Sequence, residues 1–169
     1  MNRYVDILNR IRQNVNLDWL TPSQQVAYNW LCERLEFLDE VNLWGEHGVG
    51  KTFIGWVLQA QGLGVYTPRL EDAERIQTLP LHRTIIVDNL GWRRSEVRDA
   101  LYCCRSLGYD KIVLITTECV QEQMAAIQLS LTDEDIQKVI TNLLSIGVAP
   151  YDDAPRNLWD IISPISLKE

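Results

Sequence analysis

The stretch Gly45-Glu46-His47-Gly48-Val49-Gly50-Lys51-Thr52 decides the fold of this chain. It fits the pattern G-x-x-x-x-G-K-[ST], which predicts a loop that binds phosphate groups. A short apolar run, residues 41–44, precedes the loop and predicts a buried strand. Residues 51–60 follow it with apolar side chains at helical spacing. A strand, a glycine-rich turn and a helix in this order are the setting that such a loop requires.

The residue types of this stretch suit a polyphosphate. Gly45, Gly48 and Gly50 can adopt positive φ and carry no Cβ, so the loop amides can turn inward around anionic oxygens. The first helical turn adds unpaired N–H groups and the positive end of the helix dipole. Lys51 is expected to reach the β- and γ-phosphates, and the Thr52 hydroxyl is expected to bind Mg²⁺. All eight residues are candidate nucleotide-binding residues. The absence of a guanine-reading Asn/Thr-Lys-x-Asp motif favours ATP.

Length and composition indicate one acidic domain. The 169 residues, of which 46% are hydrophobic, suffice for one packed core. The 16 Lys and Arg residues against 23 Asp and Glu give a net charge of −7, so no overall basic field attracts nucleic acid. Arg93, Arg94 and Arg98 are the candidate for a local basic patch, although a solvated helix start is the favoured interpretation. Contact with DNA is expected only through an assembly that aligns such patches.

The sequence predicts a cytosolic protein. It has no apolar run near 18 residues, so no transmembrane helix is expected. Residues 1–6 include Asp and Asn where a signal peptide needs an apolar stretch. The four cysteines form no C-x-x-C pair, and with only two histidines a zinc site is not expected.

A second apolar strand carries the expected metal ligand. Residues 83–89 include three consecutive β-branched residues, which are typical of a buried parallel strand. Asp88 lies at its carboxyl end, where open α/β sheets bind their ligands. We predict that Asp88 holds Mg²⁺, directly or through water, together with Thr52. A turn or N-cap aspartate is the less favoured alternative.

Two further segments bear on the site. The predicted strand 111–117 ends in Thr116 and Thr117, which could touch the γ-phosphate or the attacking water, or could simply leave the core. Thr21 and Gln24 predict a capping box at the start of a helix over 22–38. The phrase around them resembles the glutamine motif that precedes the phosphate-binding loop of some helicases, but capping is the favoured role of Gln24.

These elements predict an α/β protein, a three-layer αβα sandwich with a mostly parallel sheet, which resembles the sheet of the P-loop NTPases. N-terminal helices and a short C-terminal helical extension complete it. Residues 1–19 are expected to form an N-terminal helical segment, 20–118 the P-loop NTPase core, and 119–169 an abbreviated helical part of the same domain. Within this last part, helices are predicted over 119–129, after a Thr132 N-cap, and over 156–162.

The loop 45–52 and the strand end 85–89 resemble those of the P-loop NTPases. The phrase Gly-Glu-His-Gly-Val-Gly-Lys-Thr looks like the loop of AAA+ ATPases, with His47 where many members have proline. Thr116 and Thr117 after the next strand resemble the sensor of the additional-strand branch. The resemblance covers residues 20–118. It implies an ATPase that assembles with itself or with a partner protein, away from membranes.

Two departures from this family bear on hydrolysis. Most members have Glu after the strand-end Asp as general base, whereas this chain has Asn89. An amide cannot accept the proton, but it can orient a water. Other acids could substitute only if the fold brings one to the γ-phosphate; these are Glu71, Glu74 and Glu118.

The second departure concerns the arginine finger, which the family usually places soon after the sensor strand. No arginine lies between Thr117 and Arg156. Arg156 is therefore the candidate lid or sensor arginine, and the arginines at 93, 94 and 98 are candidates to act across a subunit interface.

Three functions are compatible with the sequence. The favoured one is an AAA+-like ATPase whose Mg·ATP binding and slow hydrolysis control self-assembly or a partner, in a setting that can include DNA. Its candidate catalytic residues are Lys51, Asp88, Asn89, Thr116 and Thr117. The first alternative is a nucleotide-gated interaction module that hydrolyses poorly or not at all. The second is a small-molecule kinase, which the shortage of arginine in the C-terminal half disfavours.

Overall fold

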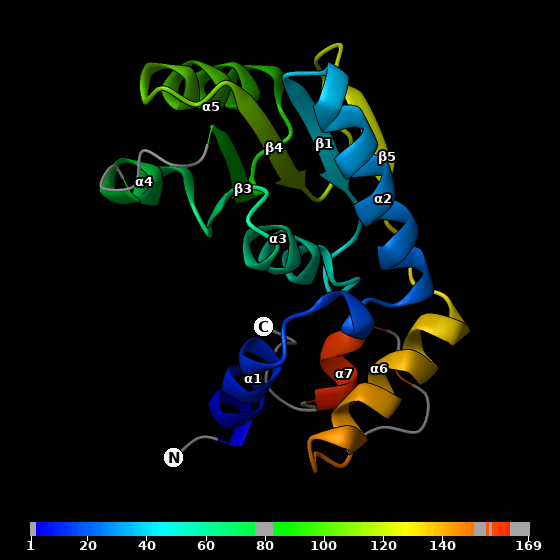
Figure 1. Cartoon of the computed structure of the whole chain (residues 1–169). Helices are drawn as coiled ribbons and strands as arrows, with labels where there is room; N and C mark the ends of the chain where they lie inside the picture. The colour runs from blue at the N-terminus through cyan, green and yellow to red at the C-terminus, as the bar shows by residue number, and fades with distance from the viewer. Residues whose placement is uncertain (1–2, 77–82, 151–154, 156, 163–169) are drawn as a thin grey trace.

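The computed structural model describes residues 3–76, 83–150, 155 and 157–162 (Figure 1). Five parallel strands form one sheet in the order β2-β3-β4-β1-β5. The strands are β1 (Glu40–Trp44), β2 (Val65–Thr67), β3 (Thr84–Leu90), β4 (Lys111–Thr116) and β5 (Ala125–Gln128). The strands β1, β4 and β3 are neighbours in this order. Because they are parallel, their carboxyl ends lie side by side at the same end of the sheet.

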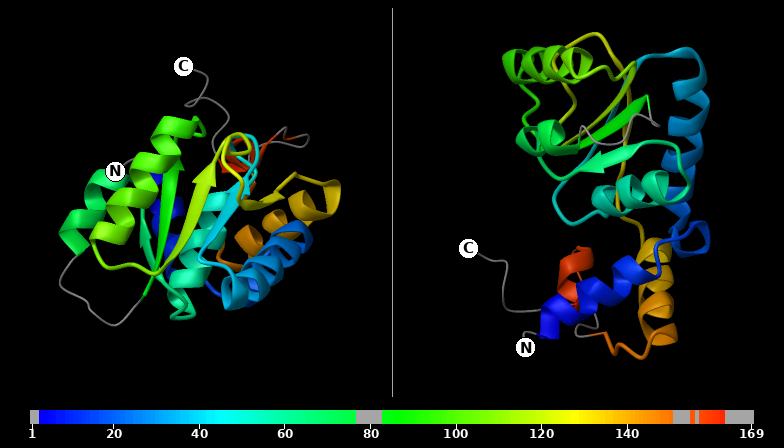
Figure 2. Two further views of the ribbon diagram at one scale, coloured as in Figure 1. Left: turned by 90° about the horizontal axis from the view of Figure 1, so that it is seen from above. Right: turned by 60° about the vertical axis from the view of Figure 1, so that its left-hand side comes forward.

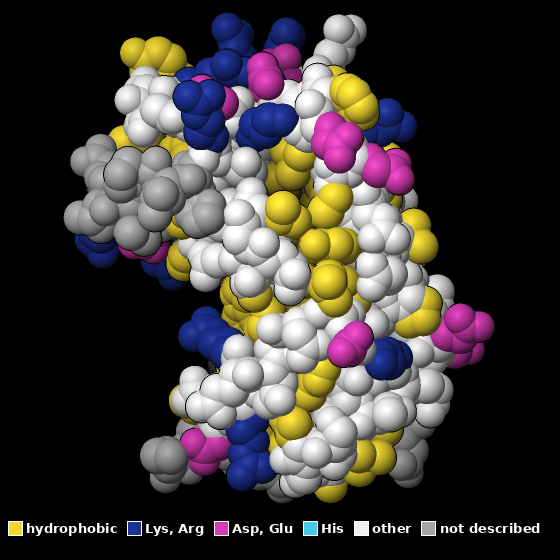
Figure 3. All heavy atoms as spheres, viewed as in Figure 1, with side chains coloured by type: hydrophobic (Ala, Val, Ile, Leu, Met, Phe, Trp, Pro, Cys, Tyr) yellow, Lys and Arg dark blue, Asp and Glu magenta, His cyan; other side chains and the backbone are white. Residues whose placement is uncertain are grey.

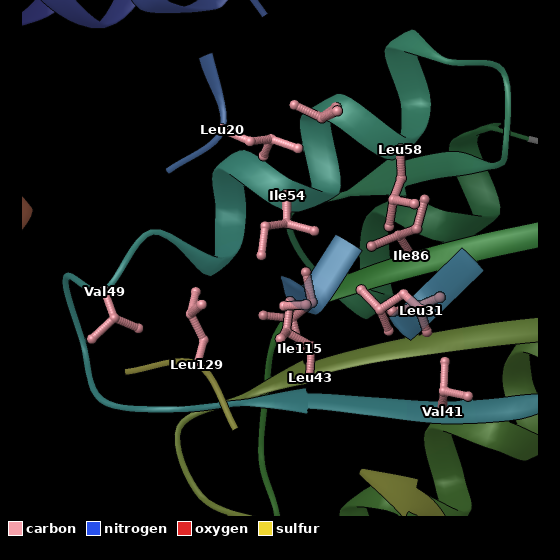
Figure 4. Packing of buried hydrophobic residues seen from close by; sticks show 13 residues of the cluster. Leu20, Leu31, Val41, Leu43, Val49, Ile54, Leu58, Ile86, Ile115 and Leu129 are labelled. Atoms are coloured by element: carbon pink, nitrogen blue, oxygen red, sulfur yellow. The ribbon is translucent and has the colours of Figure 1, made fainter. Parts of the chain in front are cut away.

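Helices cover both faces of the sheet (Figure 2). On one face, α2 (Pro22–Phe37) and α3 (Lys51–Ala60) pack against the strands through a cluster that includes Leu31, Ile54 and Leu43 (Figure 4). On the other, α4 (Leu70–Ala73), followed by the 3-10 turn η2 (Glu74–Ile76), and α5 (Arg94–Ser106) are close to β3 and β4. Alternate residues of the strands, such as Ile85 and Ile86, supply the two clusters. The predicted three-layer sandwich with a parallel sheet is confirmed.

The helix predicted over 119–129 is wrong. Residues 125–128 instead form β5, which extends the sheet beside β1 with Val41 opposite Ala125 and Trp44 opposite Gln128. Its two alanines have high intrinsic helix propensity, and this favoured a helix in the sequence. The open edge of β1 overrides that preference, because pairing there satisfies the backbone groups of both strands.

Three helices form a separate cluster beyond the carboxyl ends of the strands (Figures 1 and 2). They are α1 (Arg3–Gln13), α6 (Asp133–Ser145) and α7 (Leu158–Ile162). Ile7 of α1, Leu143 of α6 and Ile161 of α7 are buried together. The first helix thus packs against the last two, although more than 100 residues separate them in the sequence.

Two capping boxes hold this helical cluster to the sheet part of the molecule. The box predicted at Thr21–Gln24 is present, and the predicted N-cap Thr132 forms a second box with Asp135. Asp135, in the second box, also accepts a hydrogen bond from the backbone N–H of Ser23 at 2.9 Å. The starts of α2 and α6 are therefore joined through one buried carboxylate. In addition, Asn142 of α6 donates to the carbonyl of Trp19 in the 3-10 turn η1 (Leu17–Trp19) at 2.8 Å.

In the described part of the chain, the helices are too short or too polar to cross a bilayer.

Candidate functional site

The loop 45–52 connects β1 to α3, as the sequence predicts. Gly48 and Gly50 have φ of 81° and 94°, in the left-handed region that favours glycine. Gly50 is the N-cap of α3, so the N–H groups of the first helical turn open toward the loop. A Cβ at Gly48 would lie 2.8 Å from the Cβ of Asn157. The loop therefore depends on glycine for both its conformation and its packing.

Lys51 lies over this loop. Its Nζ donates to the carbonyls of Gly45 at 2.6 Å and Glu46 at 2.7 Å. Burial lowers the pKa of Lys51, and the nearby charge of Asp88 acts in the opposite direction. An ammonium group held this way is a partly desolvated cation, which suits a phosphate ligand.

Asp88 is buried at the carboxyl end of β3, where the sequence predicts it. Its Oδ2 accepts hydrogen bonds from the Thr52 hydroxyl at 2.6 Å and from the Tyr66 hydroxyl at 2.7 Å. Its Oδ1 accepts from the backbone N–H of Asn89 at 2.8 Å. The hydroxyl oxygen of Thr52 and the carboxylate of Asp88 thus converge, and they fit the oxygen ligands that Mg²⁺ prefers.

Asn89 occupies an irregular position in β3. Its φ is 52°, and the register between β3 and β4 shifts between Val87 and Leu90. Asn tolerates the left-handed region better than most residues with a side chain. Its Nδ2 donates to the carbonyl of Pro68 at 3.2 Å. The amide is therefore engaged with the loop after β2, at the margin of the site.

The two threonines after β4 differ in their surroundings. Thr116 is buried, and its hydroxyl accepts from Asn42 Nδ2 at 2.9 Å and donates to the carbonyl of Glu118 at 2.7 Å. Asn42 is itself fully buried in β1. Thr117 is half-buried, one residue beyond the strand. Thr116 is thus committed to internal hydrogen bonds, which leaves Thr117 as the better placed polar side chain.

Gln24 joins α2 to the loop. Its Oε1 accepts from the backbone N–H of Thr21 at 3.0 Å, as the capping box requires, and its Nε2 donates to the carbonyl of Gly50 at 3.1 Å. Both ends of the amide therefore have partners within the protein. This supports the capping interpretation and adds a contact with the phosphate-binding loop.

These residues line one cavity of about 680 Å³ between the sheet and the cluster of α1, α6 and α7. The space-filling view is hollowed between these two parts (Figure 3). The polar residues of the lining include Lys51, Thr52, Asp88 and Thr117. The apolar half comes from several elements, and its members include Leu8, Ile11, Trp19, Phe53, Val139 and Leu143.

The cavity is lined by an acid that differs from the expected ones and by one of the expected arginines. Besides Asp88, the acid that lines it among the described residues is Glu96, at the start of α5, rather than Glu71, Glu74 or Glu118. Arg93 lines it as well, whereas Arg94 forms a 2.9 Å ion pair with Glu122. Arg93, Arg94 and Arg98 share a shallow depression with Trp92. Arg156 lies outside the described residues.

Sequence reasoning missed two polar side chains of the site, Tyr66 and Glu96. Tyr66 belongs to the short strand β2, and its position near a strand end was the available signal, because carboxyl ends of parallel strands share one edge. Glu96 had no such signal. Its place depends on the path of the loop after β3, where its Oε2 accepts from the backbone N–H of Arg93 at 3.2 Å.

Comparisons with known proteins establish the fold. No protein-family model matches the sequence, and a comparison with curated proteins finds no match. AMPPCP-bound DnaA from Aquifex aeolicus is similar over 88% of this chain, with a TM-score of 0.56 and 16% identity. The chain shares its fold with this neighbour, which is an AAA+ P-loop ATPase. A solved DNA replication initiation factor is also similar, over 76% of this chain, with a TM-score of 0.51 and 12% identity. The chain spans 62% and 53% of the lengths of these two neighbours.

Proposed function

We propose that this chain binds Mg·ATP in the cavity and uses binding and slow hydrolysis to control its own assembly or a partner. The observation that carries the proposal is the convergence of the left-handed glycines at 48 and 50, the Lys51 ammonium and the Thr52–Asp88 pair on one cavity. The neighbouring DnaA structure, which contains the ATP analogue AMPPCP, supports the choice of nucleotide.

Each part of the nucleotide has a counterpart in the cavity. The N–H groups of residues 48–52 and the Lys51 ammonium would bind the phosphates. Thr52 and Asp88 would hold Mg²⁺, which supplies charge neutralisation to the phosphates when bound. The apolar half of the cavity, including Ile11 and Leu143, would receive the flat adenine ring.

Asn89 stands where a general base would follow the strand-end Asp88. Hydrolysis requires a water to attack the γ-phosphorus and to lose a proton, and the amide of Asn89 cannot accept one. Asn89 with Thr116 or Thr117 would at most orient the water, and Thr117 is the better placed of the two threonines. This chemistry favours slow turnover. It also favours the alternative of a nucleotide-gated module that does not hydrolyse ATP.

Asn89→Glu distinguishes these two functions. A carboxylate at this position would restore a general base, and we expect the turnover number to rise by at least about tenfold, at the low end of what such a base contributes. The left-handed backbone at 89 costs Glu about 1 kcal/mol of stability, which the fold should tolerate. Asn89→Gln is the matched control, because it has the same length without the carboxylate. Turnover at the background level of the assay in both variants would favour the non-hydrolysing module.

Control of assembly has its own test. Phosphate release from Mg·ATP should rise more than linearly with protein concentration if a site is completed between subunits, as trans-acting arginines at 93, 94 or 98 would require. A strictly linear dependence over a hundredfold range of concentration, with wild-type protein, would contradict self-assembly.

The setting that we propose is cytosolic, where Mg·ATP is available. The neighbour solved as a DNA replication initiation factor supports a DNA-associated process. The net charge of −7 favours contact with DNA through an assembly over contact by the single chain.

A further inference from the structure

Tyr66 supplies a hydrogen bond to the carboxylate that is proposed to hold Mg²⁺. Its hydroxyl donates to Asp88 Oδ2 at 2.7 Å, the same oxygen that the Thr52 hydroxyl contacts. An ionised carboxylate can only accept hydrogen bonds, so the phenol of Tyr66 is the donor in this contact.

The ring of Tyr66 is held so that its hydroxyl reaches Asp88. It lies against Gly55 of α3, where an added Cβ would come within 2.8 Å of the ring. A glycine inside a helix costs about 1 kcal/mol relative to alanine, and here it makes room for the ring. Trp56 packs edge-on against the same ring, with centroids 6.4 Å apart. Arg12 is in the last turn of α1, and its guanidinium lies 4.8 Å from the centroid of the Trp56 ring.

The donors to Asp88 fall into two kinds. Thr52 is itself a proposed metal ligand, so its hydroxyl has a second role to fill when Mg²⁺ is bound. Tyr66 and the backbone N–H of Asn89 have no such role, and they contact different oxygens of the carboxylate. Together these two donors fix the orientation of the Asp88 side chain, whether or not the Thr52 hydroxyl donates to it.

We propose that Tyr66 is a positioning residue for the metal-binding carboxylate of Asp88, an inference that rests on the proposed function. Trp56 of α3 packs edge-on against the ring of Tyr66, and Arg12 of α1 covers Trp56, so both helices hold the Tyr66 hydroxyl in place. Tyr66 thus sets the affinity of the site for Mg²⁺ without touching the nucleotide.

Tyr66→Phe tests the proposal, because it removes the hydroxyl and keeps the ring against Gly55 and Trp56. Calorimetry would measure ATP affinity in EDTA, and then the Mg²⁺ concentration that half-saturates binding at fixed ATP. We expect metal-free ATP affinity within about twofold of wild type and half-saturation at about tenfold higher Mg²⁺, the size expected for one hydrogen bond to a charged group. Tyr102→Phe is the matched control, since Tyr102 is 77% exposed on α5.

The outcomes separate the two levels of inference. Wild-type Mg²⁺ dependence in Tyr66→Phe would overturn the positioning role and leave the nucleotide site intact. Equal losses of metal-free and Mg²⁺-dependent affinity, with a lowered melting temperature of the free protein, would also overturn it, because they indicate a merely structural role. If wild-type protein binds no ATP with or without Mg²⁺, the proposed function itself fails and this inference fails with it.

Discussion

Lys51→Ala is expected to weaken Mg·ATP binding by at least about a hundredfold, about 2.8 kcal/mol at 1.4 kcal/mol per decade. The Lys51 ammonium is partly buried, 2.6 and 2.7 Å from two loop carbonyls, so water and salt screen its attraction for phosphate only weakly. Hydrogen bonds between charged groups contribute more than neutral ones, and alanine leaves no cation in the loop. Calorimetric titration with Mg·ATP measures the loss directly.

The control for this variant is Lys138→Ala, which removes the same charge from α6 outside the cavity lining. Its affinity should stay within about twofold of wild type, because Lys138 is outside the lining of the cavity. Both variants should keep cooperative thermal unfolding. An unchanged affinity in Lys51→Ala would refute the assignment of residues 45–52 as the phosphate-binding loop.

The sequence predicted those parts of the site that depend on neighbouring residues in the chain. The loop at 45–52 needs glycines, a strand and a helix in succession, and all of these lie within residues 40–60. The position of Asp88 could be predicted because a strand of β-branched residues directly precedes it in the sequence. In both cases local conformational preference and tertiary context agree, so the pattern alone was sufficient.

Other parts depend on contacts between distant segments, which a local pattern does not encode. β5 forms because β1 offers an unpaired edge, against the helix propensity of Ala125 and Ala126. The inward orientation of Thr116 depends on Asn42, 74 residues earlier. The position of Tyr66 depends on Gly55, which the sequence shows only as a glycine in a helix.

Asp135→Ala is expected to lower the free energy of unfolding by about 3 kcal/mol, the upper range for a lost hydrogen bond to a charged group. Asp135 is 1% exposed, and its carboxylate joins two helix starts. It accepts from the Ser23 N–H at 2.9 Å, and from the N–H and hydroxyl of Thr132 at 2.8 and 2.7 Å. Alanine leaves these partly buried donors without their acceptor. Urea unfolding at pH 7 measures the loss.

Asp133→Ala is the matched control, because Asp133 is also in the first turn of α6 but is exposed. Both acids interact with the helix dipole, an effect of less than about 1 kcal/mol, so the excess loss in Asp135→Ala reports the buried hydrogen bonds. A loss equal to that of Asp133→Ala would show that the carboxylate does not join α2 to α6.

The stabilisation by Asp135 should also depend on pH with a defined sign. Burial alone would raise the pKa of this carboxyl group, but hydrogen bonds from Thr21, Ser23 and Thr132 hold it below its usual value. The carboxyl group therefore binds a proton more readily in the unfolded chain than in the folded protein. Its contribution to the free energy of unfolding is complete above about pH 4 and is lost as the pH falls through the lower pKa of the folded state. The difference in free energy of unfolding between wild type and Asp135→Ala should therefore shrink from pH 7 to pH 3. A difference that grows on acidification would contradict this, because it would mean that the folded protein holds this carboxyl group protonated.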